Sequence, residues 1–395
     1  MPSLSRRITS LNAGGGDGWE IFYKARALRA SGVRVTELTI GEPDERTDPS
    51  ILAEMHRAAA AGHTGYAVVP GIPALRDAIA ARVTARTGVA TTRDNVLVTP
   101  GGQSALFAAH MAACNSGDAA LMIEPHYVTY PGTLRAAGAV PHSIATRPEH
   151  SFFPDAGEVR RKARETGASA LLINSPSNPT GAVYPRAVLE GLAGVARDED
   201  LWLISDEVYD TQIWEGEHLS PRALPGMAER AMVIGSLSKS HAMTGSRIGW
   251  LIAPEPAIAA LIDLATNTTY GVPGYIQDAA LYALTADATL EPRVAQPFRR
   301  RRALAQQILS RQSIVGLVPS GGAMYLFLDV RATGLSGIAF ADALLDTHRI
   351  AVMPGESFGP SAAGFLRVAL TIPDAEFAEA LATLTGFAVT LAKAA

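Results

Sequence analysis

Short, continuous apolar runs alternate with segments of helical periodicity between about residues 95 and 253. The runs that predict strands are Asn95–Val98, Ala119–Ile123, Ala168–Ile173, Leu201–Ile204, Met232–Ile234 and Ile248–Ala253, and the helical segments are Gln103–Ala113, Val128–Ala137 and Pro185–Arg197. Strands without polar alternation are typical of a parallel sheet that helices cover on both faces. The alternation therefore predicts a large α/β domain with a mostly parallel central sheet.

The pattern changes after Gly274. It predicts one long helix, Glu291–Ser310, followed by Met324–Val330, the helix Gly337–Thr347, Ala351–Pro354, Phe365–Leu370 and the helix Asp374–Ala392. These elements indicate a smaller α+β domain, and we expect the amino-terminal helix from Trp19 to Leu28 and the strand Val33–Ile40 to join it. The predicted division is an arm at 1–16, a small domain at 17–45 and 282–395, and a large domain at 46–281. The cationic run Arg299–Arg302 is expected on a solvated or interdomain face.

Composition excludes several classes of protein. In 395 residues, 48% are hydrophobic, 18% are charged and the formal net charge is −4, which fits a soluble globular chain and gives no support to a nucleic-acid partner. The single cysteine, Cys114, excludes an internal disulfide and a thiolate metal site. No uncharged apolar run has the length of a membrane span, and no signal segment is recognisable near the amino terminus. We expect a cytoplasmic protein without membrane, nucleic-acid or metal partners.

Lysine is scarce, and one of the four lysines follows a strand. Lys239 comes just after the apolar run Ala231–Ile234, and α/β folds bind their ligands at the carboxyl ends of strands. If the side chain is buried there, desolvation and the neighbouring Arg247 lower its pKa and yield the neutral amine that condenses with an aldehyde. A lysine in a surface loop fits the spacing equally well. The other three, Lys24, Lys162 and Lys393, are expected to be solvated.

Other strand ends carry complementary groups. A glycine-rich turn, Thr99–Ser104, opens a helix and presents N–H groups to an anion. Asn178 lies in a rigid turn after a strand, and Asp206 ends another strand; alone, each is compatible with an ordinary turn or helix cap. Together with Tyr127 and Lys239 they match a flat, anionic cofactor that carries an aldehyde.

These motifs resemble the class I/II aminotransferases, enzymes of fold type I that depend on pyridoxal 5′-phosphate (PLP). The likeness extends from Gly41 to Arg367, and its most specific parts are Asn178–Gly181, Asp206–Tyr209 and Ser236–Arg247. Within that family the chain looks most like the arginine–pyruvate transaminases. One departure is Ser246, where many relatives have tryptophan.

The resemblance implies a role for each matching residue. Lys239 would carry PLP and move the substrate proton, Asp206 would pair with the pyridinium nitrogen, and Tyr127 would stack on the ring. Tyr209 and Asn178 would bind the ring 3-oxygen. The phosphate would be bound by Gly102, Gln103, Ser236, Ser238, Arg247 and, from the partner subunit of a homodimer, Tyr66.

The substrate carboxylate would be held by Arg367, whose planar guanidinium binds a carboxylate through two hydrogen bonds. Asn178 and the Gly41 backbone would assist. Glu20 and Glu42 are candidate partners for a guanidinium on the substrate. The implied reaction is a ping-pong transamination from an L-amino acid, with arginine as the candidate donor, to a 2-oxo acid such as pyruvate.

Several alternatives stay open. An aminotransferase for aspartate or aromatic donors, a PLP-dependent β-lyase and a PLP-binding regulatory module would all use the same cofactor residues. A serine hydrolase is suggested by Gly355–Gly359, which matches G-x-S-x-G, but that architecture needs a histidine after the serine, and the last histidine, His348, precedes Ser357. A dinucleotide site is not supported, because no G-x-G-x-x-G follows a strand.

Overall fold

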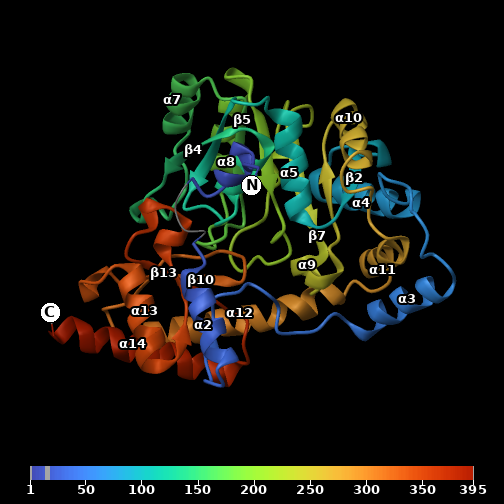
Figure 1. The fold of residues 1–395 in the computed structure, drawn as a ribbon. Helices are drawn as coiled ribbons and strands as arrows, with labels where there is room; N and C mark the ends of the chain where they lie inside the picture. Colours follow the sequence, from blue (N-terminus) through green and yellow to red (C-terminus); the bar gives the residue numbers. More distant parts are fainter. Residues whose placement is uncertain (1, 14–17, 395) are drawn as a thin grey trace.

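A seven-stranded sheet forms the centre of the computed structural model, which describes residues 2–13 and 18–394 (Figure 1). The strand order is β2-β8-β7-β6-β5-β3-β4. The strands are β2 (Val96–Thr99), β3 (Ala119–Glu124), β4 (Val140–Ala145), β5 (Ala170–Asn174), β6 (Trp202–Asp206), β7 (Ala231–Ser236) and β8 (Gly249–Ile252). β8 runs in the direction opposite to all the other strands of this sheet, which are parallel to one another. The predicted mostly parallel sheet is confirmed. Edge strand β4 was not predicted, because most of its residues are partly or fully exposed and no apolar run marks it.

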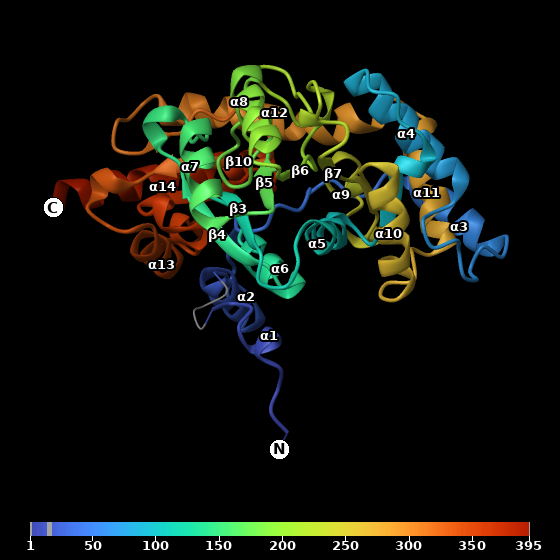
Figure 2. The ribbon, with the colours of Figure 1, turned by 90° about the horizontal axis from the view of Figure 1, so that it is seen from above.

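Helices cover both faces of this sheet, as Figure 2 shows from above. On one face lie α5 (Gly102–Ala113), α6 (Tyr130–Ala137) and α10 (Glu255–Thr266), and on the other lie α7 (Ala156–Thr166) and α8 (Arg186–Asp198). Successive residues of β5 serve the two layers, because Leu172 packs with α5 whereas Leu171 and Ile173 pack with α8. A third group of helices, α3 (Pro49–Ala60), α4 (Pro73–Thr87) and α11 (Gly274–Thr285), packs beside β2 and β8.

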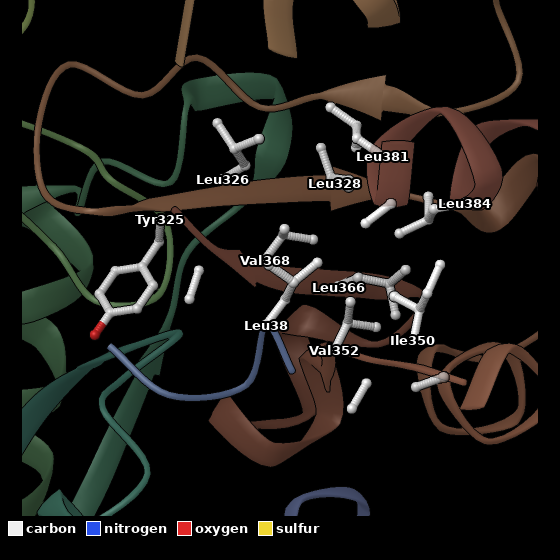
Figure 3. Close-up of a cluster of buried hydrophobic side chains, with 14 of the residues drawn as sticks. Leu38, Tyr325, Leu326, Leu328, Ile350, Val352, Leu366, Val368, Leu381 and Leu384 are labelled. Atoms are coloured by element: carbon white, nitrogen blue, oxygen red, sulfur yellow. The ribbon is translucent and has the colours of Figure 1, made fainter. Parts of the chain in front are cut away.

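A second, antiparallel sheet has the order β12-β13-β10-β9. Its strands are β9 (Gly316–Leu317), β10 (Tyr325–Asp329), β12 (Met353–Pro354) and β13 (Phe365–Ala369). Around it lie α2 (Glu20–Ala30), α12 (Leu290–Leu309), α13 (Gly337–His348) and α14 (Asp374–Ala394). Figure 3 shows how Leu326 and Leu328 of β10 meet Leu381 and Leu384 of α14 in this core. The division into domains stays a prediction, and residues 1 and 14–16 of the predicted arm lie outside the described residues; α1 (Arg6–Thr9) precedes that gap.

The predicted strand Val33–Ile40 is much shorter in the structure. Only β1 (Thr36–Glu37) pairs, in parallel, with β11 (Ile350–Ala351). After β1 the chain leaves the ladder, because the carbonyls of Thr39 and Ile40 accept hydrogen bonds from the side chains of Arg367 and Thr371. The segment therefore connects this small sheet to the site described below.

Two cations that were expected on a solvated surface, or for Arg301 on a solvated or interdomain face, are held in ion pairs, although Lys24 keeps 36% of its side chain exposed. Arg301 is only 3% exposed, donates to both carboxylate oxygens of Asp44 at 2.7 Å and reaches Asp374 at 2.8 Å. Lys24 bridges α2 to α13 through Asp342 and Asp346. In both places a cation joins segments that are far apart in the sequence.

Among the described residues, one helix, α14, is long and apolar enough by composition to cross a membrane, with a mean hydropathy of 1.2 over Asp374–Lys393. Phe377, Leu381 and Leu384 on this helix are fully buried in the core shown in Figure 3. About a third of this window, 33%, is buried in the protein.

Candidate active site

A cavity of about 240 Å³ lies where β5, β6 and β7 end. In the sheet register Asn174 stands beside Asp206, and Asp206 stands beside Ile234, so the polar residues at these strand ends face a common space. Twelve residues predicted for the site line it: Gly41, Gly102, Gln103, Tyr127, Asn178, Asp206, Tyr209, Ser236, Ser238, Lys239, Arg247 and Arg367. The structure thus brings these groups together at one edge of the sheet.

Lys239 lies on the short helix α9 (Leu237–Ser240), which follows β7 directly. The Ser236 hydroxyl begins the helix by accepting from the backbone N–H of Ser238 at 3.1 Å. The Lys239 Nζ donates to the carbonyl of Gly41 at 2.6 Å. Burial lowers the pKa of Lys239 to about 8, although the charge of Glu42 opposes that shift. A substantial fraction of the amine is therefore neutral near physiological pH.

Asp206 is a buried carboxylate facing the same cavity. Burial raises the pKa of Asp206 to about 6, and the hydroxyl of Tyr130, which donates to Oδ2 at 2.6 Å, opposes the rise. The backbone N–H of Val208 donates to Oδ1 at 3.3 Å, and the Asn174 amide donates to the Asp206 carbonyl at 2.9 Å. Tyr130 and Asn174 were not predicted. The Tyr-Pro start of α6 could have marked a helix terminus, but nothing in the sequence pairs it with Asp206.

Arg367 is 1% exposed and lies between two aromatic rings, with its guanidinium carbon 4.5 Å from the centre of Tyr325 and 4.8 Å from that of Phe358. It donates to Asn178 Oδ1 at 2.8 Å and to the Thr39 carbonyl, whereas its Nε has no partner among the described residues. A buried cation with an unused donor, facing a cavity, suits an incoming carboxylate.

Tyr325, from β10, joins the two halves of the site and was also not predicted. Its hydroxyl lies 3.0 Å from the Tyr209 hydroxyl and 3.5 Å from the Asn178 amide nitrogen. A Cβ at Gly41 would lie 1.7 Å from that hydroxyl, so only glycine lets the backbone approach here. Trp19, Ile40, Leu106 and Val208 add apolar wall that the motifs did not indicate.

The start of α5 forms an anion-binding corner. Gly101, with φ +79°, precedes the helix, and a Cβ there would lie 2.5 Å from Nη2 of Arg247. The N–H groups of Gly102 and Gln103 belong to the first helical turn, which has no intrahelical acceptors. Ser238 lines the cavity on the other side.

These groups fit PLP. The corner at α5 suits its phosphate, the neutral amine of Lys239 suits its aldehyde, and the Asp206 carboxylate suits a protonated ring nitrogen. Tyr127, which stands edge-on to Tyr130 at 5.6 Å between ring centres, also lines the cavity and offers a ring.

Three predicted residues do not line the cavity of this chain. Tyr66 is 93% exposed, and its ring packs edge to face against that of Tyr270, with 5.2 Å between the ring centres. Glu20 is exposed at the start of α2, and Glu42 is exposed and accepts a hydrogen bond from the Thr244 hydroxyl at 2.6 Å. Among the described residues that line the cavity, the cations are Lys239, Arg247 and Arg367, as the sequence suggested. Within 2–13 and 18–394, no group of three or more His, Cys, Asp or Glu residues could hold a metal ion.

Comparisons with known proteins cover nearly the whole chain. Residues 33–384 match the family model described as aminotransferase class I and II. The chain is 43% identical over 361 residues to an arginine–pyruvate transaminase of Pseudomonas aeruginosa, covering 90% of this chain and 91% of that relative. It is 36% identical over 385 residues to an aspartate/prephenate aminotransferase of Thermus thermophilus, covering 96% and 97%. Its fold matches a solved aspartate aminotransferase of Thermus thermophilus with maleate, with a TM-score of 0.91 and 35% identity, over 98% of this chain and 100% of that one.

Proposed function

Because the chain belongs to the class I and II aminotransferases and is a PLP-dependent transaminase, we propose that it moves the α-amino group of arginine to pyruvate by a ping-pong reaction. The observation that carries this proposal is one cavity in which the buried amine of Lys239, the carboxylate of Asp206 and the guanidinium of Arg367 meet. Such a set of groups can bind an amino acid by its carboxylate and transfer the proton at the neighbouring carbon.

The cofactor, when bound, supplies an electron-accepting ring for the electron pair released at the substrate Cα. In our proposal Lys239 carries the cofactor and its Nζ moves the proton at that carbon. Asp206 keeps the ring nitrogen protonated, Tyr209 and Asn178 bind the 3-oxygen, and Tyr127 covers one face of the ring. The phosphate contacts come from Gly102, Gln103, Ser236, Ser238 and Arg247.

Arg367 binds the substrate α-carboxylate, with Asn178 and the Gly41 backbone beside it. The partner-free Nε and the contact from Nη1 to Asn178 support this assignment, because they leave the guanidinium fixed but not saturated. The two aromatic rings around it keep water away from the ion pair and so strengthen it.

Arginine as donor is supported by the name of the Pseudomonas aeruginosa relative and by charge around the cavity. No described lining cation besides Lys239, Arg247 and Arg367 is present to hold a second carboxylate. Glu42, whose charge acts on Lys239, and Glu20, next to the lining residue Trp19, are the proposed partners of the substrate guanidinium.

We also propose a cytoplasmic homodimer with shared active sites, in which Tyr66 of each chain reaches the phosphate of the other. The support is the 93% exposure of Tyr66 beside the half-exposed Tyr270, since large exposed aromatic residues often mark interfaces. The cytoplasmic assignment is supported by the one cysteine, Cys114, which is buried and free.

A panel of amino donors tests the proposed substrate. With the PLP-loaded enzyme and no acceptor, arginine should give one equivalent of its 2-oxo acid per chain. With pyruvate as the acceptor, kcat/KM for arginine should exceed kcat/KM for aspartate by about tenfold or more. Glu42→Gln should lower kcat/KM for arginine and leave that for alanine nearly unchanged. A preference for aspartate or an aromatic donor would overturn the arginine proposal, and ammonia release without amino transfer would indicate a β-lyase.

A further inference from the structure

A second cavity, of about 380 Å³, lies next to the same strand ends. Asp206 lines the active site, and the following residue, Glu207, lines this second space. Its walls are helix α4, the loop 207–222 and the strands β7 and β8. We call it the α4 cavity. None of its lining residues has a role in the proposed reaction.

Two side chains that line the α4 cavity each have one buried nitrogen without a partner. Arg222 is 3% exposed; its Nη1 donates to the Ala228 carbonyl at 2.9 Å, but its Nε meets no acceptor. The side chain of His218 is 13% exposed; its Nε2 lies 3.0 Å from Glu207, but its Nδ1 meets none. A buried N–H without an acceptor is unfavourable, and folded proteins normally pair it with protein, water or ligand.

Of the other charged groups in this region, Glu207, Arg82, Arg86 and Asp210 are paired, whereas Glu217, which also lines the cavity, is exposed. Glu207 also accepts from the Ser220 hydroxyl at 2.8 Å, Arg82 contacts Glu291 at 2.6 Å, and Arg86 contacts Asp210. Among the described lining residues, the buried side-chain atoms left without a partner are the Nε of Arg222, which is a donor, and the Nδ1 of His218, which is a donor when the imidazole is protonated. A ligand that completes the site must bring acceptors.

The protonation of His218 strengthens this requirement. Burial alone lowers the pKa of its imidazole, but the adjacent carboxylate of Glu207 raises it above the ordinary value. When the imidazole is protonated it donates from both nitrogens, and Nδ1 then carries a hydrogen that has no acceptor among the described residues. With the buried guanidinium of Arg222, this favours an anionic acceptor over a neutral one.

The other part of the cavity wall is apolar. The indole of Trp250 lies against Gly235, where a Cβ would come 2.2 Å from the indole nitrogen, and Val233 and Ile234 continue the surface along β7. Val83 adds to it from α4. Apolar wall together with a few polar groups that fix orientation is the usual construction of a small-molecule site.

We propose that the α4 cavity binds a small carboxylate with an apolar body. The carboxylate accepts from the Nδ1 of His218 and the Nε of Arg222, and the apolar body rests on Trp250 and Val83. The occupant contacts the loop 207–222, which also carries Tyr209 and Gln212, and the side-chain amide of Gln212 donates to the Lys239 carbonyl at 3.1 Å. The site is therefore adjacent to the active site but separate from it.

Calorimetric titration of the PLP-loaded enzyme with phenylacetate tests this proposal. Because Arg367 also binds carboxylates, the titration is repeated in Arg367→Gln, where one phenylacetate per chain should still bind. Phenylacetamide, which lacks the negative charge, should bind about tenfold more weakly.

Two variants address the cavity itself. Val83→Trp fills it, and His218→Gln keeps a donor for Glu207 while removing the second donor; each should weaken phenylacetate binding about tenfold or more and retain transaminase activity. Ala85→Trp, at an exposed position on the same helix, should bind like the wild type. Absence of binding at millimolar phenylacetate, or binding that Arg367→Gln abolishes and both cavity variants retain, would overturn the proposal.

Discussion

Asp206 and Glu207 are neighbouring carboxylates at the end of one strand, yet they face two different environments. Asp206 receives one hydroxyl, from Tyr130, and a long contact from the Val208 N–H, and burial raises its pKa to about 6. Glu207 receives His218 on one oxygen and Ser220 on the other. Asp206 can still accept a hydrogen bond from a ligand. Glu207 instead bonds His218 and Ser220 and so holds the loop 207–222 together. Unused acceptor capacity thus separates the two carboxylates, because Asp206 can still bind a ligand whereas both oxygens of Glu207 are occupied by protein donors.

The largest expected effect comes from Lys239, which faces the same cavity as Asp206. Lys239→Arg should lower kcat at least about 10³-fold, because a guanidinium stays protonated and cannot act as a neutral amine. The measurement is the initial rate of 2-oxo acid formation together with the thermal melting curve. Lys24→Arg is the matched control and should keep its contacts with Asp342 and Asp346 and its activity. An active Lys239→Arg enzyme would refute the assignment.

The direct test of the comparison exchanges each carboxylate for its amide. Asp206→Asn should lower kcat about 10²-fold to 10³-fold, because the charge that stabilises a ring proton is lost. Glu207→Gln should change kcat less than about threefold and lower the free energy of unfolding by about 2 kcal/mol, because it weakens two hydrogen bonds to a buried charge. Steady-state rates and denaturant unfolding measure both. Equal losses of kcat in the two variants would remove the distinction between the two carboxylates.

A smaller effect is expected at Arg367, which lines the same cavity as Asp206. Arg367→Lys should raise the KM for the amino donor about 30-fold to 100-fold with a lesser change in kcat, since an ammonium cannot make the paired contact with a carboxylate. The stacking against Tyr325 and Phe358 is lost as well. Amines without a carboxylate serve as the control, because their poor KM should be unchanged by the substitution. A KM for amino acids that stays at the wild-type value would assign the carboxylate to another residue.

The same comparison explains how far the sequence leads. Polar residues directly after apolar strands, such as Asp206 and Lys239, could be predicted because strand ends of a parallel sheet share one edge. Tyr130 and Tyr325 could not, since each reaches the site from an element whose position depends on packing of the whole chain. Arg301 was expected on a solvated or interdomain face. Its buried contacts could not be predicted for the same reason, because its partners, Asp44 and Asp374, are distant in sequence.

The smallest predicted effect concerns pH on the Glu207 side. Glu207 raises the pKa of His218 above that of an unfolded histidine, about 6.5, so the folded state binds this proton more tightly. The resulting stabilisation is complete below about pH 6.5 and is lost as the pH rises through the raised pKa. The difference in unfolding free energy between wild type and His218→Gln should therefore be largest at low pH and decline toward alkaline pH.

Denaturant unfolding between about pH 5.5 and 8.5 measures this difference, and Glu207→Gln provides the matched control: without the carboxylate, burial lowers the pKa of His218, so the decline toward alkaline pH should disappear or reverse. Asp206→Asn should leave it nearly intact, since Asp206 contacts Tyr130 rather than the imidazole. A His218 contribution that grew with pH would contradict the stabilisation of the imidazolium by Glu207. A contribution that vanished in Asp206→Asn would show that the two neighbouring carboxylates do not act independently.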